Sequence, residues 1–191
     1  IRNFMPHKPY SQFLEYMYEM PTMKVWAAQA EAGTLEGVQQ HFMAPRKPLE
    51  ELYDIHVDPH EINNLAVSKD HQDVLHTMRK QLRQWMLETR DLGLLPESDM
   101  HHRAGKKPFR DLGKDSHRYP MKRILKIASL PLEGIEALPK LETALTDSDA
   151  AIRYWALTGL IVLEAPDAQL EQAARGLLTD PSAAVRITAA D

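Results

Sequence analysis

The chain contains no cysteine among its 191 residues. This absence excludes disulfide bonds, thiolate zinc sites and cysteine nucleophiles, although it does not identify a compartment. Long apolar runs are also missing, and without a run of about 18 apolar residues a membrane-spanning helix is not expected. The net charge of −4 provides no basic field for nucleic acid. The remaining composition, 43% hydrophobic and 26% charged, is typical of a globular protein with one or two domains.

Both ends of the sequence lack boundary signals. It opens with "IRNFMPHKPY", which has neither an initiator Met nor a signal peptide. It closes with "AAVRITAAD", where a helical pattern still runs and no cap follows. We therefore expect a piece of a longer protein, and the missing targeting signal says nothing about localisation.

Residues 1–96 are expected to form an α+β domain, a small antiparallel sheet with packed helices. Residues 1–4 and 49–55 have the alternation of short strands, and prolines follow the first and precede the second. Between them, the apolar spacing over residues 10–42 predicts three short helices. A long amphipathic helix is predicted over residues 71–89. Its apolar stripe consists of Val74, Leu75, Met78, Leu82, Trp85 and Met86.

The remainder divides into two parts. Residues 97–120 are rich in His, Lys, Arg, Gly and Pro, which indicates a linker or an irregular surface loop. Residues 121–191 contain an internal repeat, because "LTDSDAAIRYWAL" from Leu145 and "LTDPSAAVRITAA" from Leu178 align with a period of 33 residues. Such a period predicts stacked helix pairs, an all-α solenoid. The turn resembles that of HEAT-type repeats, and further copies are expected downstream.

Two residues recur in this repeat, Arg153 and Arg186. An arginine at this position is expected to bond the turn of a neighbouring copy, here Asp147 or Asp180, so we interpret both arginines as structural.

The stretch "EELYDIHVDPHEINNLA", residues 50–66, is dense in carboxylates. A calcium loop requires alternating oxygen ligands and a central glycine, but Asp54, Asp58 and Glu61 have no glycine between them. A carboxylate pair for acid–base chemistry stays an alternative, although strand alternation would place Glu51 and Asp54 on opposite faces. The favoured interpretation is structural: a strand end, an Asp-Pro turn and an asparagine-rich cap.

The same stretch resembles a family pattern. "ELYDIHVDPHEINNLA" is similar to the "ELYDL-x-x-DP-x-E-x-x-NLA" segment near the carboxyl end of type I sulfatases, members of the alkaline-phosphatase-like superfamily. The flanks "IRNF" and "VLHTMRKQLRQWMLETRDLGLLPE" also resemble this family, and the likeness covers about residues 1–100. It implies a carboxyl-terminal subdomain with a short antiparallel sheet and one long helix. It also implies a periplasmic or secreted parent protein that hydrolyses sulfate esters, with sulfated glycans as expected substrates.

The chemistry that this resemblance implies is not encoded here. The family uses a formylglycine made from a "C/S-x-P-x-R" motif, and a calcium ion held by an early Asp-Asp pair and a later Asp-Asn pair. Neither "SLPLEG" nor "DPSAAVR" has the required order. We therefore expect no cofactor in this chain, with calcium and formylglycine supplied by an upstream catalytic domain of the same parent. The isolated chain is expected to be inactive.

Two basic segments are candidate substrate contacts. "MPHKPY" carries His7, Lys8 and Tyr10 on a proline-flanked turn, and cations suit a sulfated sugar. A solvated loop is the competing interpretation. "MHHRAGKKPFRD" presents His101, His102, Arg103, Lys106 and Lys107. Adjacent histidines point apart and lack an obvious third ligand, so a metal site is not expected and an exposed linker is the alternative.

Three functions are consistent with the sequence. The chain can be the carboxyl-terminal part of a sulfatase that contributes structure and cleft residues. It can be an interaction module whose helical repeats bind a protein partner. It can also derive from a related phosphodiesterase or phosphonate hydrolase, which shares this tail but varies in its nucleophile.

Overall fold

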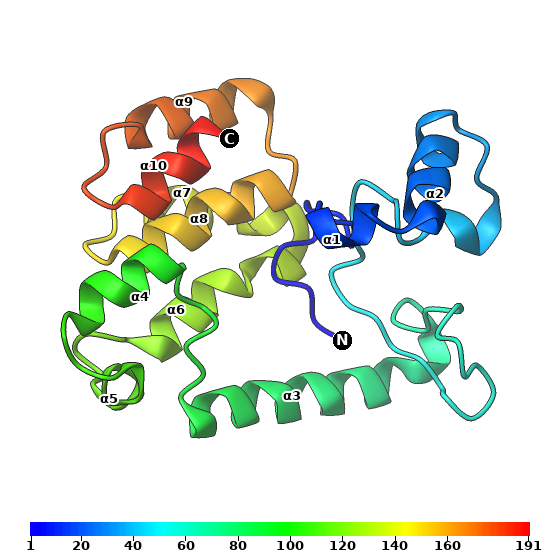
Figure 1. The fold of residues 1–191 in the computed structure, drawn as a ribbon. Helices are drawn as coiled ribbons and strands as arrows, with labels where there is room; N and C mark the ends of the chain where they lie inside the picture. Colours follow the sequence, from blue (N-terminus) through cyan, green and yellow to red (C-terminus); the bar gives the residue numbers. More distant parts are fainter. The chain divides into compact units, whose positions relative to one another are not determined.

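The computed structural model describes all 191 residues and is helical, with 57% of residues in helices and 1% in strands. The helices, with 3₁₀ helices labelled η, are α1 (Glu15–Tyr18), α2 (Pro21–Glu31), η1 (Gly37–Gln40), η2 (Lys69–His71), α3 (Gln72–Thr89), α4 (Glu97–Ala104), α5 (Phe109–Lys114), α6 (Met121–Ala128), η3 (Leu130–Ala137), α7 (Leu138–Ala144), α8 (Ala150–Val162), α9 (Asp167–Leu177) and α10 (Ala183–Ala190). Figure 1 shows these elements coloured along the chain.

The chain divides into two compact units, Ile1–Leu75 and His76–Asp191. The division falls within the first turn of α3. Each unit is described by itself below.

The antiparallel sheet expected in the first unit is absent, so the α+β prediction is wrong. The two expected strand segments do pair, but only as an isolated antiparallel bridge between Arg2 and Glu50. Flanking backbone bonds join Asn3 N to Leu49 O at 3.0 Å and Glu51 N to Ile1 O at 3.1 Å. Prolines on either side lack the N–H groups that would extend this ladder, and so short a pairing does not make a sheet.

The helical part of the first unit is small. In the α2–η1 segment, Met23 of α2 and Leu35 are the buried apolar side chains, each 6% exposed. Trp26 stacks on Phe42 with ring centroids 5.1 Å apart, and its Nε1–H donates to Gln39 O at 3.0 Å. These contacts close the α2–η1 segment on itself.

The long helix predicted over residues 71–89 is confirmed, because α3 spans Gln72–Thr89. Its apolar stripe is only partly covered. Met86 is 5% exposed, whereas Met78 and Trp85 are 52% and 57% exposed.

Residues 97–120, for which the composition predicted a linker or irregular loop, contain α4 and α5. Three side chains, Ala104, Leu112 and Tyr119, are almost fully buried. Tyr119 also donates its hydroxyl proton to the carbonyl of Asp91. Few apolar residues are present here, but each of these three is buried, which is why the segment packs despite its polar composition.

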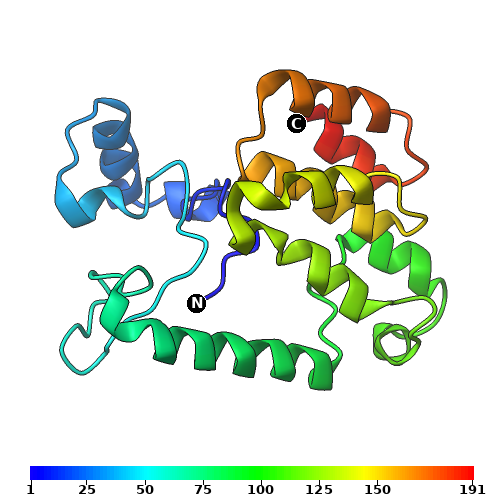
Figure 2. The same ribbon diagram turned by 180° about the vertical axis from the view of Figure 1, so that it is seen from behind.

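The core of the second unit lies among the helices after residue 120. Figures 1 and 2 show α6, α8 and α10 side by side, while α7 packs on α8 and α9 on α10. The central helix α8 is buried along most of its length. Its Trp155 donates Nε1–H to Leu94 O at 2.7 Å in a fully buried bond. This bond ties the segment after α3 to the helical core.

The turns within the two helix pairs have the same hydrogen bonds. Asp147 Oδ1 accepts from Asp149 N at 2.9 Å, and Asp180 Oδ1 accepts from Ser182 N at 2.8 Å. Arg153 Nη1 donates to Asp147 O at 2.8 Å, and Arg186 Nη1 donates to Asp180 O at 2.6 Å. The period seen in the sequence therefore corresponds to a repeated turn geometry.

No helix in the structure combines the length and apolar character needed to cross a bilayer.

Candidate functional site

A buried carboxylate, Glu51, organises the first unit. The residue is 6% exposed and accepts hydrogen bonds from Asn3 Nδ2 at 2.6 Å, from Tyr53 Oη at 2.7 Å and from Tyr10 Oη. Three donors from three segments thus converge on one side chain. The strand alternation drawn from the sequence did not predict this convergence, because the donors lie up to 48 residues away.

These bonds decide the charge state of the cluster. Burial by itself would raise the pKa of Glu51, but the bonds from Tyr10, Tyr53 and Asn3 outweigh it and lower the pKa. Burial, followed by the contact with Glu51, raises the pKa of Tyr10 to about 12 and also raises that of Tyr53. Around neutral pH the carboxylate is ionised and both phenols keep their protons. Such a group holds segments together and is not suited to proton transfer.

The rest of the acidic stretch has a structural role as well. Asp58 Oδ2 accepts from Asn63 N at 2.7 Å, which closes the Asp-Pro turn. Asn64 accepts from Leu52 N and donates to Glu50 O, both at 3.0 Å. These side chains bond to backbone groups, so the interpretation of residues 50–66 is right about the turn at Asp58-Pro59. The strand end that it also predicted is reduced to the bridge at Glu50.

The first predicted substrate contact, "MPHKPY", lies beside this cluster. Tyr10 directs its hydroxyl to Glu51, and Lys47 Nζ lies 5.2 Å from the centre of its ring. His7 and Lys8 are half-buried, and Lys8 N bonds to Met5 O at 3.2 Å in a turn. Tyr10 therefore has a structural partner, and contact of His7 or Lys8 with substrate stays a prediction.

The second predicted contact lies on α4, and its residues point to different surroundings. His101 packs edge-on against Phe109, with ring centroids 4.9 Å apart, and is exposed. His102 lines a pocket described below. Arg103 instead binds Asp99 through Nε at 2.9 Å and Asp149 through Nη1 and Nη2 at 2.8 and 2.7 Å.

Arg103 consequently joins α4 to Asp149, the N-cap residue of α8. Its side chain is 11% exposed. Burial would lower the pKa of its guanidinium, but the Asp149 and Asp99 carboxylates reverse this effect and raise it. The spacing of Asp99 and Arg103, four residues apart on one helix, could have signalled half of this network. Asp149, 46 residues away, could not have been found from spacing.

A polar pocket of about 770 Å³ opens beside His102, between α4 and the turns that precede α8 and α10. Its charged lining includes Asp147, Arg153 and Asp180. Each of these side chains forms an ion pair within the chain. Arg153 binds the Asp180 carboxylate through Nε at 2.6 Å and Nη2 at 2.8 Å. Arg123 binds Asp147 Oδ2 at 2.7 Å.

The structural interpretation of Arg153 is thereby confirmed, since it bonds both aspartates that the sequence proposed. The hydrogen bond from Arg153 is the main cause of the lowered pKa of Asp180, and the pKa of Arg153 is raised in return. The pocket walls are thus built from internally neutralised ion pairs.

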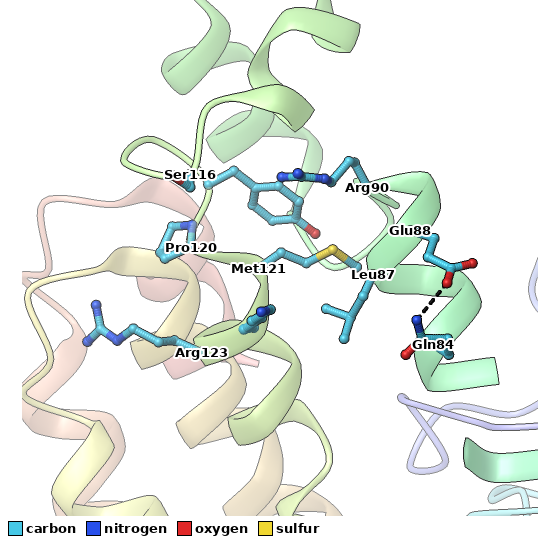
Figure 3. Close-up of a pocket in the computed structure, with 10 residues that line it drawn as sticks. Gln84, Leu87, Glu88, Arg90, Ser116, Pro120, Met121 and Arg123 are labelled. Carbon is cyan, nitrogen blue, oxygen red and sulfur yellow. Dashed lines mark hydrogen bonds between the residues drawn. The ribbon is translucent and has the colours of Figure 1, made fainter. Parts of the chain in front are cut away.

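A second cavity, of about 700 Å³, lies between the carboxyl end of α3 and the amino end of α6. Figure 3 shows Leu87 and Met121 meeting between the two helices, with Arg90 extending from the end of α3. Lys122 and Arg123 also line this cavity. No sequence motif predicted this cavity, because α4 and α5 lie between its two sides in the sequence.

Neither cofactor of the sulfatase resemblance fits residues of this chain. The structure contains no group of three or more His, Asp or Glu side chains placed to hold a metal ion. The sequence contains no cysteine and no serine in the required "C/S-x-P-x-R" order. A formylglycine or a calcium site would therefore need residues other than these.

Comparison with known proteins identifies the kinship of about half of the chain. Over 100 residues the sequence is 35% identical to an ulvan-active sulfatase of Formosa agariphila. The chain contains a sulfatase-related region. The aligned part makes up 52% of this chain but only 17% of that sulfatase. No family model and no solved structure matches the chain.

This match agrees with the resemblance to sulfatases noted in the sequence, at the level of a related region. The HEAT-like character of residues 121–191 stays a prediction.

Proposed function

We propose that this chain is part of a sulfatase that hydrolyses sulfate esters of sulfated glycans, and that it contributes structure and substrate-cleft residues to that enzyme. The observation on which the proposal depends is the 35% identity over 100 residues to an ulvan-active sulfatase. A sulfatase that acts on ulvan needs a glycan that bears sulfate esters, so this substrate class is the natural expectation for the chain.

The chain's own residues support a structural role. Glu51 gathers Tyr10, Tyr53 and Asn3 into one cluster, and residues 50–66 form hydrogen-bonded turns. His7 and Lys8 lie next to this cluster and are the proposed contacts to anionic substrate groups. Formylglycine and calcium, when present, supply the nucleophile and the positive charge for ester cleavage. In this proposal they belong to another part of the protein.

Sulfate release by the complete gene product tests this proposal. The complete product should release sulfate from ulvan oligosaccharides, whereas purified residues 1–191 should release none. Phosphodiesters and phosphonate esters should be assayed in parallel, because preferential cleavage of either would support the related hydrolase instead. A gene product without sulfate release, or turnover by residues 1–191 alone, would contradict the proposal.

A second role, protein binding by the helical part, is favoured by the repeated Arg–Asp turns. Arg123 binds Asp147 and Arg153 binds Asp180, so an ion pair links each of the two turns to another helix. Repeated stacking of this kind creates extended surfaces in solenoid proteins. Affinity capture with the full chain, compared with a variant whose exposed α9 and α10 side chains are replaced, should recover a protein partner. The absence of any partner, with sulfate release unaffected in the variant, would exclude this role.

A further inference from the structure

The cavity between α3 and α6 combines apolar walls with an excess of positive charge. Leu87, Pro120 and Met121 supply apolar surface, and Met121 is buried at 6% exposure. Three of the lining side chains are cationic and one, Glu88, is anionic. The chain as a whole has a net charge of −4, whereas the charged side chains that line this cavity are mostly cationic. A volume of about 700 Å³ is within the range of small-molecule sites.

Some of the charged side chains that line this cavity have partners within the chain, and others have none. Arg123 binds Asp147 at 2.7 Å, and Glu88 accepts from Gln84 at 2.6 Å. Arg90 and Lys122 form no ion pair or side-chain hydrogen bond within the chain. Figure 3 shows Arg123 directed away from Leu87, whereas Arg90 extends toward the side where Ser116 lies. Two cations are therefore available for an external anion.

The backbone holds these cations in place. Arg90 adopts a left-handed conformation with a φ of 57°, which is uncommon for residues other than glycine. Gly113 of α5 packs closely on it, because a Cβ at position 113 would lie 3.2 Å from Arg90 O. The buried Tyr119 donates its hydroxyl proton to Asp91 O and so joins the end of α3 to the segment that precedes Lys122. Both sides of the cavity are thus tied together before any ligand binds.

We propose that this cavity is a binding site for a sulfated saccharide, with a sulfate group between Arg90 and Lys122 and the apolar side of the sugar on Leu87, Pro120 and Met121. The choice of sulfate over other oxyanions rests on the proposed function. Guanidinium and ammonium groups both bind such oxyanions through charge-assisted hydrogen bonds. This site is distinct from the residues 7–10 and 101–103 that the sequence suggested.

Binding to the full 191-residue chain tests the site. A sulfated ulvan oligosaccharide, its desulfated counterpart and inorganic sulfate are titrated by calorimetry, and backbone amide shifts are followed by NMR. The variants are Arg90→Gln and Lys122→Gln. Lys126→Gln is the matched control, because Lys126 is an exposed residue of the same helix that does not line the cavity. Thermal unfolding verifies that each variant is folded, and Lys122, which is exposed, is the substitution least able to perturb folding.

We expect Arg90→Gln and Lys122→Gln each to weaken binding of the sulfated oligosaccharide about ten-fold, the loss of one charge-assisted contact. Lys126→Gln should bind like the natural protein, and amide shifts should map to residues around 116–123. Raising the salt concentration should weaken binding, since the charges are exposed.

Several outcomes would overturn the site: no binding of the sulfated oligosaccharide, equal binding of the desulfated one, unchanged affinity in both variants, or shifts that map elsewhere. The proposed function is judged separately by sulfate release. If the complete gene product released no sulfate, the proposed function would fail. The binding affinities of the natural chain and its variants would still decide whether the cavity binds the sulfated oligosaccharide.

Discussion

Arg153 and Asp180 form a bidentate ion pair that joins the two helix pairs of the second unit. The guanidinium contacts both carboxylate oxygens, at 2.6 and 2.8 Å, across 27 residues of sequence. The side chains are 12% and 4% exposed. Because the same Arg also bonds the carbonyl of Asp147, one side chain holds its own turn and the next turn together.

Replacing Asp180 with Asn should lower the free energy of unfolding by about 3 kcal/mol, because it leaves a largely buried guanidinium without its counter-charge. Urea unfolding followed by circular dichroism measures this loss. Arg175→Gln is the control, because the Arg175–Glu171 pair is exposed on α9 at 74% and 62%. There we expect a change of about 0.5 kcal/mol or less. Equal losses in the two variants would contradict a special role for Asp180.

Replacing either of two helical glycines with alanine should change the stability of the chain, but in opposite directions. A Cβ on Gly159 of α8 would lie 2.6 Å from Leu141 Cδ2, and Leu141 is fully buried. We expect Gly159→Ala to destabilise by about 1–3 kcal/mol net of the gain in helix propensity, since overpacking a core outweighs that gain. A Cβ on Gly176 of α9 would meet nothing within 4 Å.

Gly176→Ala should consequently stabilise the chain by up to about 1 kcal/mol. Thermal unfolding of both variants is the measurement. A stabilising Gly159→Ala would show that α7 can move away from α8 at little cost.

The indole of Trp155 provides a buried hydrogen bond whose loss can be isolated. Trp155→Phe removes the donor to Leu94 O and leaves a buried carbonyl unsatisfied, for an expected cost of about 1–3 kcal/mol beyond the change in packing. Trp26→Phe removes a similar bond to Gln39 O at an exposed position, where water can replace the donor. Denaturant unfolding of each variant should therefore show a clear loss only for Trp155→Phe. Comparable losses would mean that ring packing, rather than the hydrogen bond, decides the effect.

The Glu51 cluster should make the first unit sensitive to alkaline pH. The folded pKa of Tyr10 is about 12, above its ordinary value of 10.0. Between these values the unfolded chain releases the proton while the folded chain keeps it, so stability falls as pH rises through this window. Denaturant unfolding at a series of pH values checks the slope. Tyr10→Phe should make the slope shallower, and an unchanged slope would show that Tyr10 does not titrate in this range.

The elements predicted correctly are those whose signals are local. The apolar period of α3 and the Asp–Arg turns of the two helix pairs are readable because helical neighbours lie three and four residues apart in sequence. The 33-residue spacing of Asp147 and Asp180 marks equivalent turns for the same reason.

The errors arose where distant segments must meet. Residues 1–4 and 49–55 have strand-like alternation, but only one bridge forms between them, and a sheet cannot be inferred from either segment alone. In residues 97–120, few apolar residues suggested a loop, yet Leu112 and Tyr119 are buried against other parts of the second unit. The composition of a segment gives the number of its apolar residues, but it does not show which of them pack against other parts of the chain.

By itself, the sequence determined the helical register of α3, the repeated turns and the sulfatase kinship, all of which depend on residues close together in the chain. Only the tertiary structure decided that Glu51 would bind Tyr10, that Arg103 would bind Asp149, and that Arg90 and Lys122 would border one cavity. Each of these arrangements needs a chain closure over tens of residues. Its geometry depends on the packing of whole helices, which no local pattern encodes.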